Sequence, residues 1–366
     1  MVGRPGDDRP SVSELLARSE GAAAPAGTRR LGRPGRPGRQ ARRWAVAAIV
    51  ALILLGAAYY VGLLAYVDNT VERSDVLRLA GPEIIEVDRQ RDAENFLLVG
   101  IDDGERDTVV VAHLSQDGSR SVVLVLPGQA YVDVPACQGS DGQPTEPYGG
   151  PVSSVYGTGG AGCLVRTVQL LTGLRINHYV QLDIAGFPAM VEALGGVPMC
   201  LRSTVRDDAS GLNLPAGSAV IDGDQTLQFL RLQSRAGPAE AERIERQQQF
   251  LASLLDRSLA PATLANPVRL TRFLTVAAES LTLDPDTSFG DLRTLIELLR
   301  DLNSDSVVLV TAPISDPDFR PAGSSSSYLL LDEQLGRQLF QSIIDNSAVL
   351  PAEVRPPPSP AGVTCG

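Results

Sequence analysis

The hydrophobic pattern of the chain begins with an uncharged run of 24 residues, 44–67. A helix of that length rises ~36 Å, which is enough to cross the ~30 Å hydrocarbon core of a bilayer. Trp44 and Tyr66 lie near its ends, where aromatic side chains favour the membrane interface, and Arg42 and Arg43 precede it. A buried core helix and a cleaved signal peptide are the alternatives, but the apolar part of a signal peptide is usually only ~7 to 15 residues long. The run therefore predicts a retained transmembrane helix.

After this run, short apolar segments alternate with segments of helical period. The polar stretch 68–94 predicts a stalk, and the globular part is expected to begin at Asn95. Short apolar runs bounded by turn residues predict buried strands, whereas amphipathic runs predict helices. Strands are expected at 96–100, 108–113, 121–127, 178–183 and 306–311, and helices at 163–171, 184–194, 225–231, 239–259, 289–302 and 331–344. This alternation predicts one α/β sandwich domain over 95–350, followed by a Pro-rich tail over 351–366.

The charges are distributed unevenly along the chain. The net charge is -11, all 32 basic residues are arginine, and residues 1–43 carry +6 while the remainder carries -17. The positive-inside rule places the Arg-rich segment 1–43, which is expected to be disordered, in the cytoplasm. The main domain is then extracytoplasmic on a single-pass anchor in the plasma membrane. An outer domain this acidic argues against nucleic-acid binding.

All four cysteines follow the apolar run, which fits disulfide formation in an oxidising compartment. Four cysteines allow three connectivities. Cys137 with Cys163 is the favoured pair, because the two bracket the Gly-rich stretch 139–162, which a bridge would restrain. No spacing resembles a zinc site.

Several motifs together resemble the LytR-CpsA-Psr family of the Gram-positive cell envelope. They are NFLLVGIDD, RDTVVVAHL, LPGQAYVDVP, LTGLRINHYVQLDIAGFPAMVEALGGV, LNLPAGSAVIDGDQTLQFLR and AERIERQQQFL, which together extend over about Asn95–Leu259. The resemblance implies a central mixed sheet flanked by helices. It also implies transfer of a glycopolymer from a polyprenyl-pyrophosphate carrier to peptidoglycan or another wall acceptor. The Arg-only, Gly-, Pro- and Ala-rich composition is typical of a GC-rich genome and suggests an actinobacterial host.

The resemblance also implies a metal site. The family's acidic ligands match Asp102, after the first strand, and Asp107, just before the second. Carboxylates together with phosphate oxygens suit Mg²⁺, or Mn²⁺ in its place. Without the resemblance, the two residues would be interpreted as ordinary turn residues at strand ends.

The remaining implied site residues are Arg106, Arg231, Glu240, Arg243 and Gln247. Arginines are suited to holding the pyrophosphate, whose leaving phosphate gains charge during transfer. Arg243 and Gln247 lie four residues apart, on one face of the predicted helix. Gln233 stands where the family has a second arginine of a closely spaced pair.

One departure from the family pattern bears directly on activity. The family's proline-arginine-aspartate motif is replaced here by Pro127-Gly128-Gln129. Loss of a charge-assisted contact to phosphate costs ~1.5 to 3 kcal/mol. Two hypotheses therefore stay open: an active phosphotransferase, or a catalytically impaired relative that binds a polyprenyl-linked glycan or a partner enzyme.

Other catalytic classes find no support in the sequence. There is no GxSxG stretch for a hydrolase nucleophile, no GxxxxGK[ST] loop, and no GxGxxG that opens a helix after a strand. His178 lies within a strand motif, so a packing or hydrogen-bonding role is favoured over that of a catalytic base.

Overall fold

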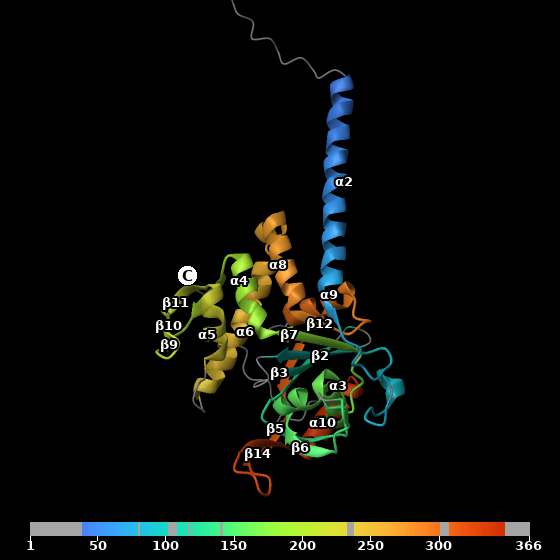
Figure 1. Cartoon of the computed structure of the whole chain (residues 1–366), viewed down its shortest axis with the longest axis vertical. Helices are drawn as coiled ribbons and strands as arrows, with labels where there is room; N and C mark the ends of the chain where they lie inside the picture. Colours follow the sequence, from blue (N-terminus) through green and yellow to red (C-terminus); the bar gives the residue numbers. More distant parts are fainter. Residues whose placement is uncertain are drawn as a thin grey trace, which may run out of the picture. The chain divides into compact units, whose positions relative to one another are not determined.

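We describe the protein from a computed structural model (Figure 1). The structure describes residues 39–79, 81–101, 108–115, 118, 120–139, 142–232, 238–300 and 307–347. The chain divides into two compact units, Met1–Tyr60 and Val61–Gly366.

Helix α2, Arg39–Thr70, contains the long uncharged run. Among the described residues it is the one helix long and apolar enough to cross a membrane, judged by length and composition. Its last ten residues belong to the second unit, where Leu63 and Val67 are buried. These two side chains pack in the same cluster as side chains of the central sheet. The end of α2 is therefore part of the domain core.

A seven-stranded mixed sheet forms the centre of the domain. Its strand order is β1-β12-β7-β2-β3-β4-β13. The bounds are β1 Glu72–Arg73, β12 Leu281–Leu283, β7 His178–Asp183, β2 Glu94–Ile101, β3 Thr108–Leu114, β4 Ser121–Leu126 and β13 Val307–Thr311. Strand β2 is parallel to β7, β4 is parallel to β13, and β3 is antiparallel to both β2 and β4. The carboxyl ends of β2, β7, β4 and β13 consequently lie along one edge of the sheet, which we call the strand-end edge.

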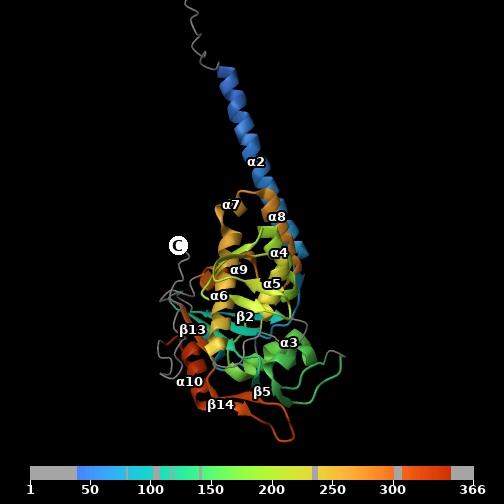
Figure 2. The ribbon, with the colours of Figure 1, turned by 90° about the vertical axis from the view of Figure 1, so that its left-hand side faces the viewer.

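One face of this sheet is covered by α3, Val152–Thr172, and α10, Glu333–Ile344, together with a second sheet (Figure 2). The second sheet has the order β14-β15-β5-β6. Its bounds are β14 Ile314–Phe319, β15 Tyr328–Leu331, β5 Ala130–Val134 and β6 Tyr148–Pro151. Leu97, Leu124, Leu164, Val165 and Leu339 belong to the buried cluster on this side. Burial of alternate strand residues against helices accounts for the apolar pattern of β2 and β4.

The other face is covered by α8, Pro267–Glu279, by α9, Phe289–Arg300, and by the end of α2. Phe96, Ala112 and Val123 point to this side from strands whose neighbouring residues point to the first side. The central strands are thus buried on both faces. This explains why they are continuous apolar runs in the sequence.

A third apolar cluster lies around α4, Phe187–Leu194, α5, Gly223–Arg231, and α6, Pro238–Leu259. Two small antiparallel ribbons complete it. They are β8 Val197–Leu201 with β11 Gly217–Ile221, and β9 Val205–Asp207 with β10 Leu212–Leu214. The short helix α7, Pro261–Leu264, connects α6 to α8.

The expected α/β architecture, a central mixed sheet flanked by helices, is confirmed. Two local differences matter for the site. The helix expected at 163–171 begins already at Val152, and the strands of the second sheet were not expected at all. The segment 68–94, expected to be a stalk, contributes Val71, Ile84 and Ala93 to the buried residues.

Candidate functional site

Four strands of the central sheet, β2, β3, β4 and β7, meet at the strand-end edge. Gly100 of β2 lies opposite Thr108 of β3, and Val109 lies opposite Leu126 of β4. On the other side of β2, Ile101 lies opposite Asp183, the last residue of β7. Asp102, Arg106 and Asp107 belong to the connection between Ile101 and Thr108, which is outside the described residues.

The turn Pro127-Gly128-Gln129 follows β4 at this edge, and its backbone is firmly held. Its three carbonyls accept from Ala130 N, Ser153 N and Leu329 N, each at 2.9 Å. The turn is therefore tied both to the start of α3 and to β15. Gln129 is exposed, so the residue in the family's aspartate position faces solvent.

Helix α3 begins directly beside this turn. Pro151 precedes its first residue and makes no side-chain cap hydrogen bond. The N–H groups of a first helical turn have no partner within the helix. Here the N–H of Ser153 donates to Gly128 O instead. The helix dipole makes this end of the helix attractive to anions. The start of α3 is thus an electropositive element beside the strand-end edge.

A sharp bend separates the first part of α3 from the rest. Gly160 has φ 66° and ψ -170°, a backbone conformation that only glycine adopts readily. A Cβ on Gly159 would lie 2.6 Å from Cβ of Cys163, so glycine is required there by close packing. The Gly159-Gly160 pair therefore sets the direction of the turns that reach Gly128.

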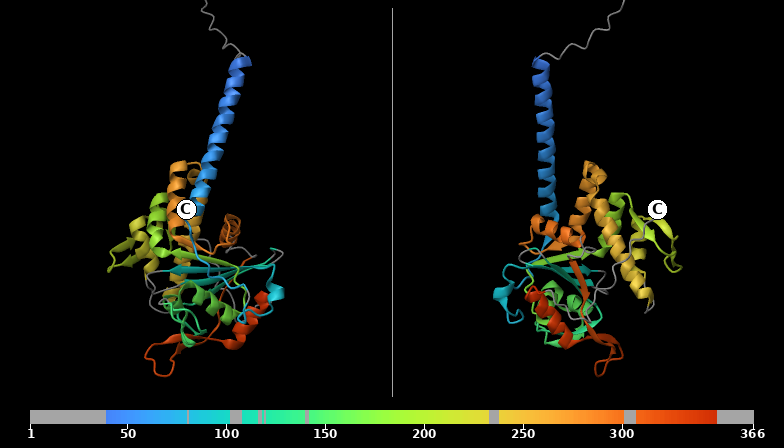
Figure 3. Two further views of the ribbon diagram at one scale, coloured as in Figure 1. Left: turned by 45° about the vertical axis from the view of Figure 1, so that its right-hand side comes forward. Right: turned by 180° about the vertical axis from the view of Figure 1, so that it is seen from behind.

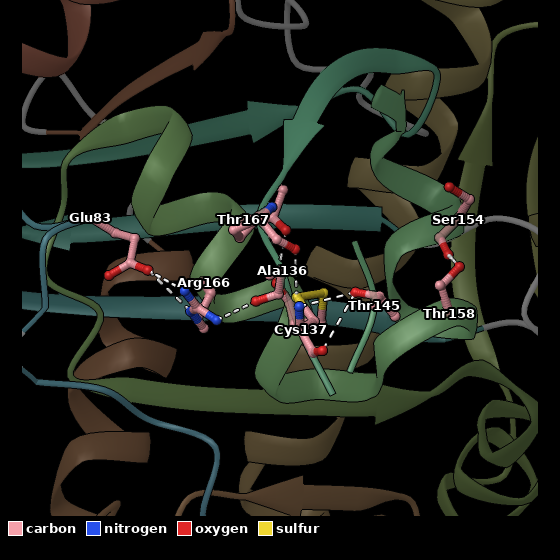
Figure 4. The surroundings of a disulfide bond; sticks show 10 residues. Glu83, Ala136, Cys137, Thr145, Ser154, Thr158, Arg166 and Thr167 are labelled. Carbon is pink, nitrogen blue, oxygen red and sulfur yellow. Dashed lines mark hydrogen bonds and ion pairs between the residues drawn. A yellow bond between two sulfur atoms is a disulfide. The ribbon is translucent and has the colours of Figure 1, made fainter. Parts of the chain in front are cut away.

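A disulfide attaches α3, just after the bend, to the segment that follows β5 (Figure 4). Cys137 and Cys163 are bonded with a Cα–Cα distance of 5.5 Å, which confirms the pairing favoured from the sequence. One turn later on α3, Arg166 donates to Ala136 O at 2.5 Å and to Glu83 Oε1 at 2.5 and 3.1 Å. The hydrogen bond from Arg166 holds the pKa of the nearly buried Glu83 carboxyl below its usual value. Cys200 is disulfide-bonded as well.

The other predicted site residues come from α5 and α6. Arg231 is the last residue of α5 and is exposed. Helix α5 begins with a capping box, in which Asp222 accepts from Gln225 N at 2.9 Å. Glu240, Arg243 and Gln247 all lie on α6, but their side chains are outside what the structure describes. Helix α5 packs on α4, which follows the end of β7 after the single 3-10 turn Ile184–Gly186, so α5 is linked to the strand-end edge.

His178 lies at the other end of β7, away from the strand-end edge. Its Nδ1 is 2.8 Å from Thr287 Oγ1, its Nε2 is 2.9 Å from Glu94 Oε2, and its ring stacks on Phe96. Asp284 is fully buried nearby and its carboxylate accepts from Thr287 N at 2.9 Å. These contacts give His178 a structural role, as the sequence favoured.

Sequence reasoning overlooked two features of the site. One is the first part of α3, because the run VSSVYGTGGAG has too many glycines and β-branched residues to suggest a helix. The other is the pair of Glu83 and Arg166, which are 83 residues apart. The only available signal was the Gly159-Gly160 pair, which marked a backbone constraint without saying what it served. Among the described residues, no cluster of three or more His, Cys, Asp or Glu could hold a metal ion.

Comparison with known proteins gives a consistent set of relatives. The LytR_cpsA_psr family model matches residues 63–341. A probable cell wall biosynthesis protein LcpB of Corynebacterium glutamicum is 31% identical over 240 residues, covering 66% of this chain and 53% of that protein. A polyisoprenyl-teichoic acid–peptidoglycan teichoic acid transferase TagU of Oceanobacillus iheyensis is 28% identical over 181 residues, covering 48% and 55%. The chain spans about half the length of these curated relatives.

Among solved structures, the LytR-Csp2A-Psr enzyme from Actinomyces oris is similar in fold. It superposes with a TM-score of 0.51 at 20% identity, covering 75% of this chain and 95% of that chain.

Proposed function

Because the chain belongs to the LytR_cpsA_psr family, we propose that it transfers a glycopolymer from a polyprenyl-pyrophosphate carrier to the cell wall. The observation that carries this proposal is the family match over residues 63–341, which includes all of the candidate site residues. The named relatives are a cell wall biosynthesis protein and a teichoic acid transferase, and both names fit that chemistry. The acceptor is peptidoglycan or another wall polymer.

In the proposed reaction an acceptor hydroxyl oxygen attacks the phosphorus atom that carries the glycan. The P–O bond to the other phosphate breaks, and polyprenyl monophosphate leaves with the bonding electrons. We assign the proton of the attacking hydroxyl to Glu240. The phosphates are assigned to Arg106, Arg231 and Arg243, with Gln247 as a further hydrogen-bonding partner.

We assign Asp102 and Asp107 to a divalent cation, Mg²⁺ or Mn²⁺. Two carboxylates together with substrate phosphate oxygens are a donor set that suits either ion. The ends of β2 and β3 support the assignment, because Gly100 and Thr108 lie opposite each other and the two aspartates follow and precede these strands. A bound cation would neutralise charge that develops on the leaving phosphate.

The turn Pro127-Gly128-Gln129 supports the alternative function, a member that binds polyprenyl-linked glycan or a partner enzyme without catalysis. It supplies no guanidinium where the family has one. In the transfer hypothesis, the start of α3 beside Gly128, which has no side-chain cap, takes over part of that arginine's role, because helix N-termini bind phosphate.

For the location, we propose a plasma-membrane protein anchored once by α2, with residues 1–43 in the cytoplasm and the main domain outside. The uncharged run of α2 supports the anchor, and the excess of arginine before it supports the orientation.

The transfer hypothesis is tested on the full chain in vesicles that contain a polyprenyl-pyrophosphoryl glycan, with Mg²⁺ and with peptidoglycan added as the acceptor. The measured product is polyprenyl monophosphate. We expect Asp107→Asn to slow its formation by ~100-fold or more, because a charge-stabilising group is lost. Asp208→Asn is the matched control, since Asp208 is an exposed aspartate whose side chain pairs with Arg206 on another part of the domain.

Two outcomes decide between the hypotheses. A wild-type rate that does not exceed the Asp107→Asn rate contradicts transfer. In that case, prenyl phosphate lipid that co-purifies with the wild-type chain would support the binding function. Its absence would contradict that function as well.

A further inference from the structure

The connection between α6 and α8 forms an exposed apolar corner, residues 261–268. It has the sequence PATLANPV and carries no charge. Val268 is 77% exposed and Leu264 is 42% exposed. Pro261, Ala262, Ala265 and Pro267 are exposed too. We call residues 261–268 the α7–α8 corner.

The geometry of two neighbouring strands fixes the direction of the corner relative to the end of α2. Strands β1 and β12 are parallel neighbours, with Glu72 opposite Thr282. Each follows a helix after a single residue, α2 before β1 and α8 before β12. Leu63 and Val67 of α2 share one buried cluster with Leu270 and Ala278 of α8. The end of α2, from Val61 onward, and α8 therefore approach the sheet from the same side, as the views of the domain in Figures 1 and 3 show.

The heights of the two helices above the sheet can be compared from their lengths. The domain part of α2, Val61–Thr70, rises ~15 Å, and α8 from Glu279 back to Val268 rises ~17 Å. Val268 thus lies about as far from the sheet as Val61. Val61 is 68% exposed and belongs to the uncharged run 44–67, the part of α2 suited to a bilayer.

The charges around the corner favour the same environment. No acidic residue occurs between Arg257 and Glu279, although residues 44–366 carry a net charge of -17. Arg269 and Arg272 follow the corner on α8, and Arg272 is exposed. An exposed apolar tip with arginines behind it is suited to the boundary between acyl chains and anionic headgroups.

We propose that the α7–α8 corner inserts into the outer membrane surface as a second contact, beside α2. The inference rests on the proposed membrane anchorage of α2. With two contacts, the domain is held in one orientation at the lipid surface, whereas a single helix would leave it free to tilt and rotate.

The test uses fluorescence quenching by brominated acyl chains in the full chain, reconstituted in vesicles of phosphatidylcholine and phosphatidylglycerol. Trp44 is the only tryptophan, so the unaltered chain reports insertion of α2. Val268→Trp in a Trp44→Phe background then reports the corner. Ile314→Trp in the same background is the matched control, because Ile314 is 42% exposed on β14 of the second sheet.

We expect the Val268→Trp chain to lose at least half of its fluorescence in brominated vesicles and the Ile314→Trp chain to keep it. Arg272→Gln added to Val268→Trp should weaken the quenching in phosphatidylglycerol vesicles. If Trp44 is quenched and the Val268→Trp chain is not, the second contact is refuted and the anchor stands. If neither is quenched, both proposals fall.

Discussion

Removal of the Cys137–Cys163 bridge tests how the site is supported. The two residues are 26 positions apart in the sequence. Closing a loop of that length lowers the entropy of the unfolded chain by ~12 cal/mol/K, which corresponds to ~3.5 kcal/mol of stability at 25 °C. We therefore expect the Cys137→Ala/Cys163→Ala variant to be less stable by about that amount.

The assay is guanidinium unfolding of the Val61–Gly366 unit, followed by circular dichroism. The fragment begins at Val61 because Leu63, Val67 and Val71 are buried in the domain. The free energy of unfolding and its dependence on denaturant, the m-value, are both measured. Without the bridge the unfolded chain exposes more surface, so m should rise, whereas a simple loss of packing would leave m unchanged.

A loss below ~1 kcal/mol with an unchanged m-value would refute this reasoning. It would mean that the unfolded chain is already constrained, or that other contacts hold the bend of α3. Arg166 is the candidate for such a contact, since it joins α3 to Ala136 and Glu83 on the same side. If the bend does depend on the bridge, the variant should also transfer glycopolymer more slowly, because α3 begins at the Gly128 turn.

Three further predictions concern the same region and the core. The double substitution Gly128→Arg with Gln129→Asp restores the family motif, and neither position has a positive φ. It should raise the rate of polyprenyl monophosphate formation ~10- to 100-fold. An unchanged rate would indicate that the start of α3 already supplies the phosphate contact. Gly160→Ala should lower the free energy of unfolding by ~1 to 3 kcal/mol, because Gly160 has a φ of 66°. Gly157→Ala should raise it by up to ~1 kcal/mol, because Gly157 lies in the helix with open space around it. Equal effects of the two substitutions would contradict the bend at Gly160. Burial lowers the pKa of His113, so the unfolded state binds the extra proton at a higher pH than the folded state does. The free energy of unfolding should therefore fall as the pH drops below ~6.5, by up to ~1.4 kcal/mol per pH unit until the pKa of the folded state is reached. A His113→Gln variant should lose this pH dependence between pH 7 and 5, and a dependence that persists in the variant would belong to other groups.

The sequence predicted the parts of the fold that come from continuous apolar patterns. Strands β2, β3, β4, β7 and β13 contribute side chains to the buried clusters on both faces of the sheet, so most of their central residues are apolar whichever way they point. The uncharged run of α2 is visible because it is continuous in the sequence, and the membrane anchorage proposed for it would have the same physical basis, since a bilayer favours apolar side chains on every face of a helix. The strands of the second sheet were missed, since a segment such as YGGP in β6 is a strand only through pairing with β5.

For the site, the sequence supplied residue types and, through the family resemblance, their candidate roles. It placed Asp102 and Asp107 at the ends of two strands, but it could not show that β2, β7, β4 and β13 end along one edge, because strand order depends on contacts between distant segments. Likewise, the sequence showed only that Gly128 stands where the family has an arginine. The tertiary structure decided that its carbonyl receives the N–H of Ser153, and so brought the start of a helix, with its partial positive charge, to the place where that arginine is missing.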